Sequence, residues 1–523
     1  MEYKSVWKNY TEEGLGALEA FAEDYIGFIS TCKTERECAS FALSCAKEQG
    51  YSSLDEAIAD KKRLKPGDKV WAHAQGKALI LVHVGTEPIE AGLNILGAHI
   101  DSPRLDVKQN PLYESNDLAL LDTHYYGGIK HYQWVTTPLA IHGVVTKKTG
   151  ESVEVVVGED AGDPVFCVTD LLPHLAAEQM DKKARTVVEG ENLDVLVGNR
   201  PLVVEKDDEA PGKEPVAEPA AAGTKPVATA APAAKGAAAA AEDAAEPAAE
   251  PAAASTPEEE VVAGIEKLAE KEPVKAMLLK LLFEHYGIEE KDFLSAELEV
   301  VPAGPARDCG FDRSMVIGYG QDDRVCAYPS LRAQLAQKKP KRTCVCIFTD
   351  KEEVGSIGAT GMASRFFENT IAEVMELAGE GSGLALRRAL TASHMLSSDV
   401  SAGFDPLYPS VFEAKNAAYL GRGLVLTKYT GARGKNGSND ASAEYVAKVR
   451  AILDGAGVAF HTSELGRVDA GGGGTIAYIS AEYGMNVIDS GVAVLSMHSP
   501  WEVASKADIY EAYKGYQAFL RDA

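Results

Sequence analysis

The chain has 523 residues, and 46% of them are hydrophobic, so it can bury a sizeable core and is long enough for at least two domains. Its formal net charge of −26 argues against nucleic acids and anionic lipid surfaces as partners. Because the N-terminus lacks the features of a secretory signal and no apolar run approaches the roughly 18 residues of a membrane span, we expect a cytoplasmic protein. The chain has eight cysteines and no C-x-x-C pair, so we expect neither a disulfide scaffold nor a zinc site made of thiolates.

The first part of the chain has a mixed α/β pattern. The segment GALEAFAEDYIGFIST (16–31) predicts a helix, and the apolar runs ALILVHVG (78–85) and LNILGAH (93–99) predict strands. We therefore assign residues 1–105 to an α/β domain.

The next part of the chain has a β-rich pattern. Apolar runs alternate with turn signals in PLAIHGVVTKKTGESVEVVVG (138–158), which predicts a β-structured module. Within it, residues from about 205 to 260 consist mainly of Ala, Pro, Glu, Lys and Gly, without large apolar side chains. Such a segment cannot offset its ordering entropy by burial, so we expect a disordered loop there. We place an inserted β-rich domain at residues 106–304.

After the insertion, strand-like runs alternate with helical segments such as SLRAQLAQ (330–337) and DIYEAYKGYQAFL (508–520). This alternation is typical of a mostly parallel sheet flanked by helices. We expect residues 305–523 to complete the α/β domain that begins the chain.

Four candidate metal ligands stand at or just beyond the ends of strand-like runs. NILGAH ends at His99, CVCIFTDKEE reaches Glu353, ASHMLSSD reaches Asp399, and VAVLSMH ends at His498. In open α/β sheets the ligand crevice lies outside the carboxyl ends of the strands, so these residues can converge. Imidazole nitrogens combined with carboxylate oxygens suit zinc. Taken singly, each motif is more often structural: a core histidine, or a solvated pair of charges.

Three further motifs add carboxylates to this set. In GAHIDSP, Asp101 stands two residues after His99 and can orient its imidazole. In TDKEEVG, the side chains of the two adjacent glutamates point in different directions, so one can bind a metal ion while the other contacts the attacking water. In GQDDRVCAYPSL, Asp322 and Asp323 begin an expected helix, where a capping role is the alternative.

The motifs in combination carry a family resemblance. GAHIDSPRLDVKQNPLYE, GQDDRVCAYPSL, FTDKEEVGSIGATG, SSDVSAGFDP, GSNDASAE and MHSPWE, in this order, resemble the aspartyl aminopeptidase family of di-zinc metallopeptidases. The resemblance covers nearly all the chain except the Ala/Pro-rich segment. It implies a zinc-exopeptidase-like catalytic domain, interrupted by a dimerisation domain, that releases one N-terminal residue per cycle.

The resemblance also implies a role for each site residue. One zinc ion is held by His99, Asp322 and Asp399, and a second by Asp322, Glu353 and His498, so that Asp322 bridges the two ions. Glu352 matches the general base, and Asp101 is expected to tune the imidazole of His99. Because this chain has Asp-Asp where the family often has Asp-Asn, Asp323 remains an alternative bridge. Cobalt or manganese could replace zinc in such a carboxylate-rich site.

Two residues are expected to act on the substrate. His174, in DLLPHLAAE, matches a histidine that reaches a neighbouring subunit's active site and can stabilise the oxyanion, with a surface role as the alternative. The family name implies Asp or Glu at the substrate's N-terminus, which requires a cation in the pocket. Lys428 is the candidate, with Arg433 and Lys435 close by in the sequence.

The resemblance implies self-association as well, as a homododecamer built from dimers. Two other functions stay open: an aminopeptidase with a neutral or basic N-terminal preference, and a catalytically silent scaffold of the same fold. The glycine run in GRVDAGGGGTIAYI either lets backbone approach a substrate or forms a flexible loop.

Overall fold

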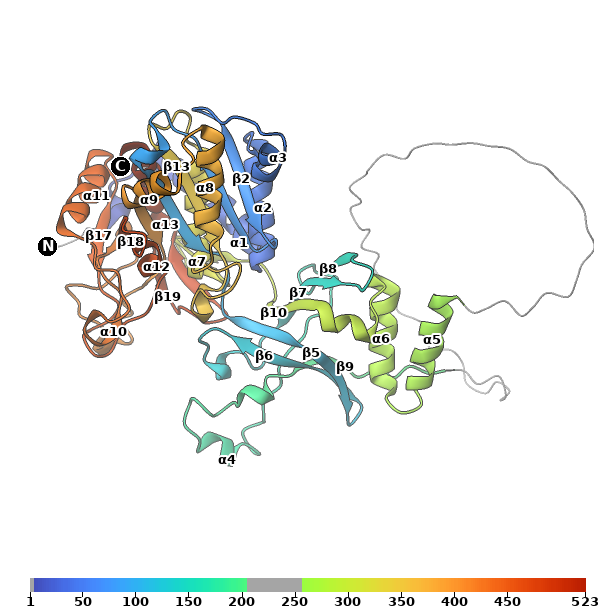
Figure 1. The fold of residues 1–523 in the computed structure, drawn as a ribbon. Coiled ribbons are helices and arrows are strands. Elements are labelled where there is room, and N and C mark those ends of the chain that lie inside the picture. The colour runs from blue at the N-terminus through green and yellow to red at the C-terminus, as the bar shows by residue number, and fades with distance from the viewer. Residues whose placement is uncertain (1–3, 205–255) are drawn as a thin grey trace, which may run out of the picture.

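A computed structural model describes residues 4–204 and 256–523. It contains two regions side by side: an α/β region (residues 4–103 and 303–523) and an insert (residues 104–302), which meet where β5 leaves and β10 re-enters the α/β region (Figure 1). No helix among the described residues combines the length and apolar character needed to cross a membrane.

The α/β region is built on a nine-stranded sheet. Its order is β1 (Ser52–Ser53), β2 (Lys69–Ala74), β3 (Ala78–His83), β13 (Thr343–Thr349), β4 (Leu93–His99), β14 (His394–Ser398), β18 (Asn486–Gly491), β16 (Leu424–Thr427), β17 (Phe460–Ser463). The central strands β13, β4, β14 and β18 run parallel, while the flanking strands β3 and β16 run antiparallel to β13 and β18. The predicted α/β fold with a mostly parallel centre is confirmed.

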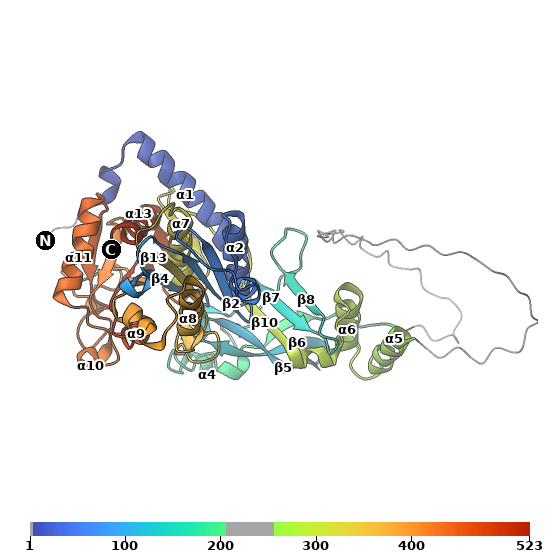
Figure 2. The same ribbon diagram turned by 45° about the horizontal axis from the view of Figure 1, so that its top comes forward.

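Helices cover both faces of this sheet (Figures 1 and 2). One face packs against α1 (Glu12–Thr31), α2 (Glu35–Glu48), α7 (Gln321–Leu335), α11 (Ala443–Gly455) and α13 (Lys506–Asp522). The other packs against α3 (Leu54–Ala59), α8 (Phe366–Ala378), α9 (Gly383–Thr391) and α12 (Ala477–Ala481). Strand β13 shows the reason for two cores: Cys344 and Cys346 face the first core and Val345 and Ile347 the second, because successive side chains alternate across a sheet.

A smaller five-stranded sheet lies against the first. Its order is β11 (Arg307–Cys309), β12 (Met315–Gly318), β20 (Glu502–Ser505), β19 (Ala493–Leu495), β15 (Ser401–Ala402). The antiparallel pairing of β19 with β20 places the connection that carries His498 at the edge of this sheet. The short helix α10 (Ala432–Lys435) follows β16.

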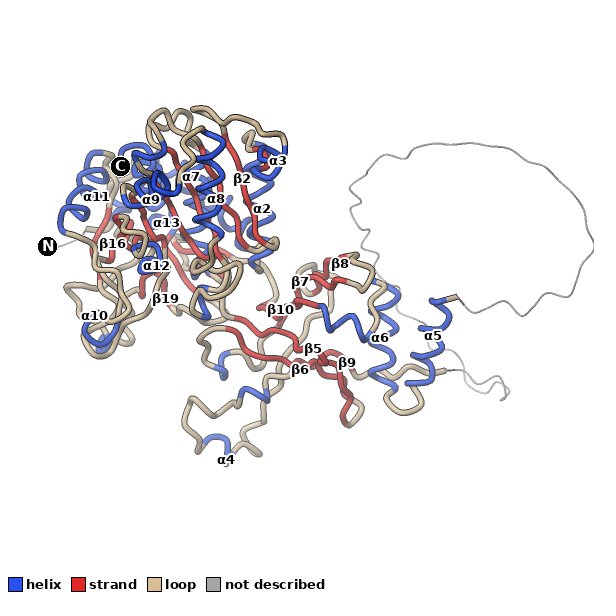
Figure 3. The backbone as a smooth tube through the Cα atoms, in the orientation of Figure 1, coloured by secondary structure: helices blue, strands red, loops and turns tan. Residues whose placement is uncertain are grey.

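The described part of the insert contains an antiparallel six-stranded sheet that packs against two of its helices. The strand order is β8 (Ser152–Val157), β7 (Leu139–Thr146), β10 (Ala296–Pro302), β5 (Arg104–Ser115), β6 (Leu118–Tyr126), β9 (Val195–Gly198). Helices α5 (Pro257–Leu268) and α6 (Pro273–Tyr286) pack on its core. Between β8 and β9 the chain makes a mostly loop-like excursion that carries the short helix α4 (Ala177–Met180) away from the sheet (Figure 3).

The predicted disordered loop at about 205–260 extends too far at its C-terminal end. Residues 205–255 lie outside the described residues, but α5 begins at Pro257. The Thr256 side chain accepts a hydrogen bond from the Glu259 backbone, and Glu259 accepts one from the Thr256 backbone at 2.7 Å. This capping box, with proline at the first helical position, starts the helix despite the alanine- and proline-rich sequence before it.

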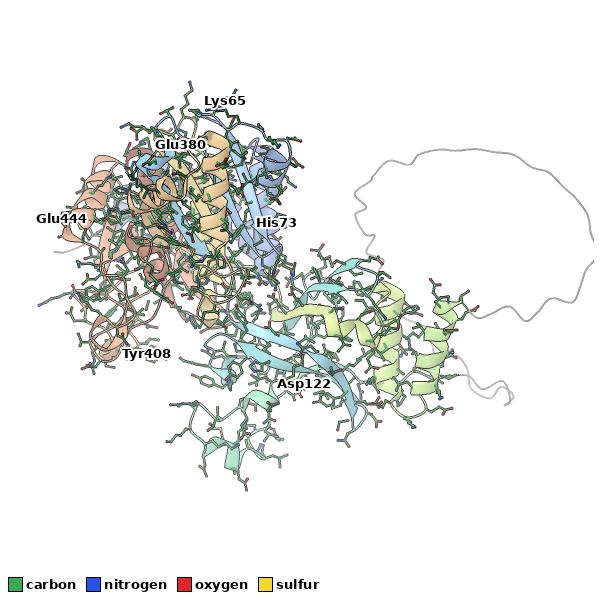
Figure 4. All side chains as sticks on the ribbon, viewed as in Figure 1. Lys65, His73, Asp122, Glu380, Tyr408 and Glu444 are labelled. Atoms are coloured by element: carbon green, nitrogen blue, oxygen red, sulfur yellow. The ribbon has the colours of Figure 1, made fainter. Side chains whose placement is uncertain are left out.

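The two regions are joined by partly buried ion pairs. In Figure 4, His73 on β2 marks the α/β region and Asp122 on β6 marks the insert. The His142 ring of β7 lies 2.7 Å from a Glu37 carboxylate oxygen of α2 and 3.0 Å from Glu159. Lys33 also donates to Glu159, at 2.6 Å. Each pair joins the α/β region to the insert or lies beside that junction.

Candidate metal centre

The predicted ligands come from three neighbouring parallel strands and two further elements. His99 is the last residue of β4, Glu353 lies in the one-turn helix Glu352–Val354 that follows β13, and Asp399 follows β14. These three strands are adjacent in the sheet, so their carboxyl ends meet at one edge. Asp322 begins α7, and His498 lies in the β19–β20 connection.

Asp322 stands between the two histidines. One carboxylate oxygen lies 3.1 Å from His99 Nε2, and the other lies 3.3 Å from His498 Nε2. His498 Nε2 is also 3.5 Å from a Glu353 oxygen. The two oxygens of a single carboxylate thus face two different groups of ligands, which is the arrangement that a bridging carboxylate needs.

Two groups of ligand atoms are close enough to hold cations. His99, Asp322 and Glu353 form one, and His99, Asp323 and Asp399 form the other, with the atoms of each group within 4.8 Å of one another. Asp323 is fully buried and joined to Asp322 by a cis peptide bond. Asp399 thus lies in a group with Asp323, whereas the resemblance pairs it with Asp322.

The charge of this cluster fits divalent cations. Burial raises the pKa of Glu352 to about 7 and holds the pKa values of Glu353, Asp323 and Asp399 well above the usual range. Among the described residues, one buried oxygen of Glu353 and both of Asp323 lack a hydrogen-bond partner. Burying so many carboxylates is costly unless cations or protons compensate them, and bound metal ions favour the charged forms.

Asp101 organises the glutamates. Its carboxylate accepts hydrogen bonds from the backbone N–H groups of Glu352 and Glu353 at 3.1 and 3.2 Å. His99 Nδ1 lies 3.0 Å from the Asp101 carbonyl oxygen and 3.4 Å from its carboxylate. Tyr126 of the insert donates its hydroxyl to the same carboxylate at 2.8 Å. Asp101 therefore holds the ends of β4 and β13 in a common arrangement.

Sequence reasoning missed two supports of the ligands. Glu502 accepts hydrogen bonds from the backbone N–H groups of Asp322 and His498, at 3.1 and 2.7 Å, which ties two ligands together. The carbonyl oxygen of Gly128, which follows β6 of the insert, lies 2.8 Å from His498 Nδ1. Glu502 is the last residue of MHSPWE, so this motif could have identified it. Gly128 lies in none of the motifs, so no sequence signal pointed to it.

A cavity of about 470 Å³ opens on the cluster. Its wall includes Asp322, Glu352, Glu353, Asp399 and His498, and a second part comes from the glycine run Gly472–Gly474 with Thr475. Among the described residues that line it, none is Lys or Arg. The cavity is large enough for a small ligand beside the cluster.

The structure places the two predicted substrate residues elsewhere. Lys428 follows β16, but its ammonium pairs with the Asp440 carboxylate, which Lys435 also contacts at 2.8 Å, and it is not among the cavity's lining residues. His174 is exposed on the excursion of the insert before α4 and does not line the cavity either. The side chain of Arg433 lies outside the described residues.

Comparison with known proteins agrees with this geometry. A family model described as "Aminopeptidase I zinc metalloprotease (M18)" matches residues 28–221 and 241–520. A probable M18 family aminopeptidase 1 from Clostridium acetobutylicum is 53% identical, over 100% of this chain and 98% of its own.

Solved structures give the same result. The crystal structure of aminopeptidase I from Clostridium acetobutylicum is 51% identical, with a TM-score of 0.81 over 99% of each chain. That of an M18 family aminopeptidase from Thermotoga maritima is 40% identical, with a TM-score of 0.83 over 100% of each chain. The chain therefore belongs to the M18 family of zinc metallo-aminopeptidases.

Proposed function

We propose that the chain is a two-zinc aminopeptidase in which Asp322 bridges the metal ions. His99 and Asp399 would complete one site, and Glu353 and His498 the other. The observation that carries this proposal is the position of the Asp322 carboxylate, whose two oxygens face His99 and His498 separately. The donor set of imidazole nitrogens and carboxylate oxygens suits zinc, although cobalt and manganese accept similar ligands.

Glu352 is the proposed general base. With zinc bound, the site would supply a water of lowered pKa and polarise the scissile carbonyl group. Glu352 lines the cavity beside the ligands, takes the proton from the attacking water and delivers it to the departing amine. Asp101 fixes the backbone of both glutamates, so the base and the adjacent ligand keep a constant relative position.

We further propose that the active enzyme is an assembly in the cytoplasm, a homododecamer built from dimers through the insert. A solved S. cerevesiae mApe1 dodecamer has this fold, with a TM-score of 0.69 at 17% identity. An exposed His174 outside its own cavity suits donation to the cavity of a neighbouring subunit, where an imidazole can stabilise the oxyanion.

The predicted preference for N-terminal Asp or Glu needs a cation that contacts the substrate side chain. Lys428 supplies one only by leaving Asp440. Relative hydrolysis rates of dipeptides beginning with Asp, Glu, Leu and Lys test this preference, and faster turnover of leucine than of either acidic residue would contradict it.

The two-zinc proposal is tested by metal analysis together with Glu352→Gln. We expect close to two metal ions per chain in both proteins and a fall in kcat of about 10²–10⁴-fold in the variant, because general-base catalysis contributes that much. Glu444→Gln, at an exposed position on α11, is the matched control and should keep full activity. An inactive wild-type protein that binds two metals would favour the scaffold alternative, and one metal per chain would contradict the two-zinc site.

A further inference from the structure

One buried carboxylate in the cavity has no role in the proposed metal site. Asp489 lies on β18, is 3% exposed, and lines the same cavity as Glu352 and Asp399. Thr475 donates its hydroxyl hydrogen to one carboxylate oxygen at 2.7 Å. The other oxygen makes no hydrogen bond of normal geometry with a described residue, although Ser397, its cross-strand neighbour on β14, is close enough for its hydroxyl group to lower the pKa of Asp489. A buried carboxylate oxygen that lacks a well-formed hydrogen bond beside a cavity can accept one from a donor outside the chain.

The position of Asp489 is set by the central sheet. In the sheet register, Asp489 lies opposite Ser397 of the neighbouring strand β14 and opposite Thr427 of β16 on its other side. Ser397 stands two residues before Asp399, which corresponds to about 7 Å along a strand. Asp489 therefore lies about two strand residues from Asp399, one of the proposed metal ligands, so a group of the bound N-terminal residue can reach it.

The electrostatics of the cavity decide what that group is. The described lining residues carry several carboxylates and no Lys or Arg, so none of them offers Asp489 a lysine or arginine partner. Burial raises the pKa of Asp489 to about 7, against the opposing effects of the hydroxyl groups of Thr475 and Ser397. A substrate carboxylate would add a further negative charge here, whereas a positively charged donor would satisfy the second oxygen and stabilise the ionised carboxyl group.

We propose that Asp489 is a specificity-determining residue that binds an ammonium group of the substrate's N-terminal residue. This inference rests on the proposed aminopeptidase function and names the substrate chemistry at its cavity. Two sources carry that chemistry: the free α-ammonium of every substrate, and the side chain of an N-terminal lysine. The first would restrict cleavage to chain ends, and the second would set a basic preference.

A pair of inhibitors tests the α-ammonium. Leucine hydroxamate and its des-amino analogue 4-methylpentanohydroxamate share the metal-binding group and differ only in the amine. If Asp489 binds the α-ammonium, the wild-type enzyme should bind the amine-bearing compound about tenfold or more tightly than the analogue, and Asp489→Asn should reduce this ratio to less than about threefold. Asp489→Glu, which keeps the charge, should restore part of the preference.

A pair of substrates tests the side chain. If Asp489 binds the lysine ammonium, Asp489→Asn should lower the ratio of kcat/KM for lysyl over leucyl amides by about tenfold, while the inhibitor ratio stays as in the wild type. The matched control is Asp454→Asn, since Asp454 is exposed near the end of α11 and does not line the cavity. Both ratios should be unchanged in it.

The inference is overturned if both ratios in Asp489→Asn stay within about twofold of wild type. Thermal melting and metal content establish that this isosteric variant folds and loads metal, and ratios between paired compounds cancel any general loss of active protein. Failure of the aminopeptidase proposal is distinguishable, because the wild-type enzyme would then lack metal-dependent hydrolysis and would not bind either hydroxamate.

Discussion

In the α/β region the proposed ligands are mostly buried and contact one another, whereas in the insert the candidate residue His174 is exposed and remote from the cavity of its own chain. Asp322 and His99 lie 3.1 Å apart although 223 positions separate them in the sequence. A single chain therefore brings the candidate metal ligands together. The proposed contribution of the insert's excursion, by contrast, would require a second subunit.

The insert nevertheless supports the metal centre of its own chain at a few points. Tyr126 and Gly128 follow or end β6 and contact Asp101 and His498. The insert thus has two sides: the end of β6 belongs to the ligand environment, and the excursion before α4 faces outward. Four predictions test this division.

The largest effect is expected from Asp322→Asn. This variant removes the negative charge that faces both histidines, so we expect loss of both metal ions and a fall in activity of roughly 10³-fold or more. Asp323→Asn is the matched comparison, since neither of its oxygens accepts a hydrogen bond from a described residue. We expect Asp323→Asn to keep two metals and most of its activity; the reverse result would make Asp323 the bridge.

His174→Ala is expected to lower kcat by about 10²–10³-fold without changing metal content, as loss of an oxyanion donor does. His73→Ala, at an exposed position of the α/β region, serves as the control. Mixed assemblies of His174→Ala and Glu352→Gln subunits should recover activity, because each variant supplies what the other lacks. An active monomer with an unaltered rate would remove the distinction between the two regions.

His142→Gln tests the junction between the regions. Burial lowers the pKa of His142, but hydrogen bonds to Glu159 and Glu37 outweigh it and raise the pKa. Because the folded-state pKa is raised, the stabilisation is complete below the ordinary histidine pKa of about 6.5 and is lost as the pH rises through the folded-state pKa. We expect the variant to lose about 1.5–3 kcal/mol at pH 6, with a smaller loss at higher pH, in denaturant titrations. An equal loss at every pH would contradict an ionised His142.

The smallest effect is expected from Lys428→Ala. Because Lys428 is paired with Asp440 outside the cavity, kcat/KM for aspartyl, leucyl and lysyl substrates should each change by less than about threefold. A selective loss of at least tenfold on the aspartyl substrate would show that Lys428 leaves Asp440 to bind acidic residues, and would restore the predicted acidic preference.

The sequence predicted the α/β class because periodicity and turn signals are local. It also nominated His99, Glu353, Asp399 and His498, since each follows an apolar strand-like run. It did not predict helix α5 at the end of the alanine- and proline-rich segment, because composition over that window outweighed the short Thr256–Glu259 capping signal.

The residue types that stand at strand ends can be read from the sequence, and the ordered motifs then indicate the family. Which of these residues meet is fixed by the tertiary structure. It placed the Asp322 carboxylate between two histidines, moved Lys428 to Asp440, and left one oxygen of Asp489 without a well-formed hydrogen bond at the cavity. The physical reason is that ligand geometry depends on the relative positions of strands from distant parts of the chain, and local sequence patterns do not encode those positions.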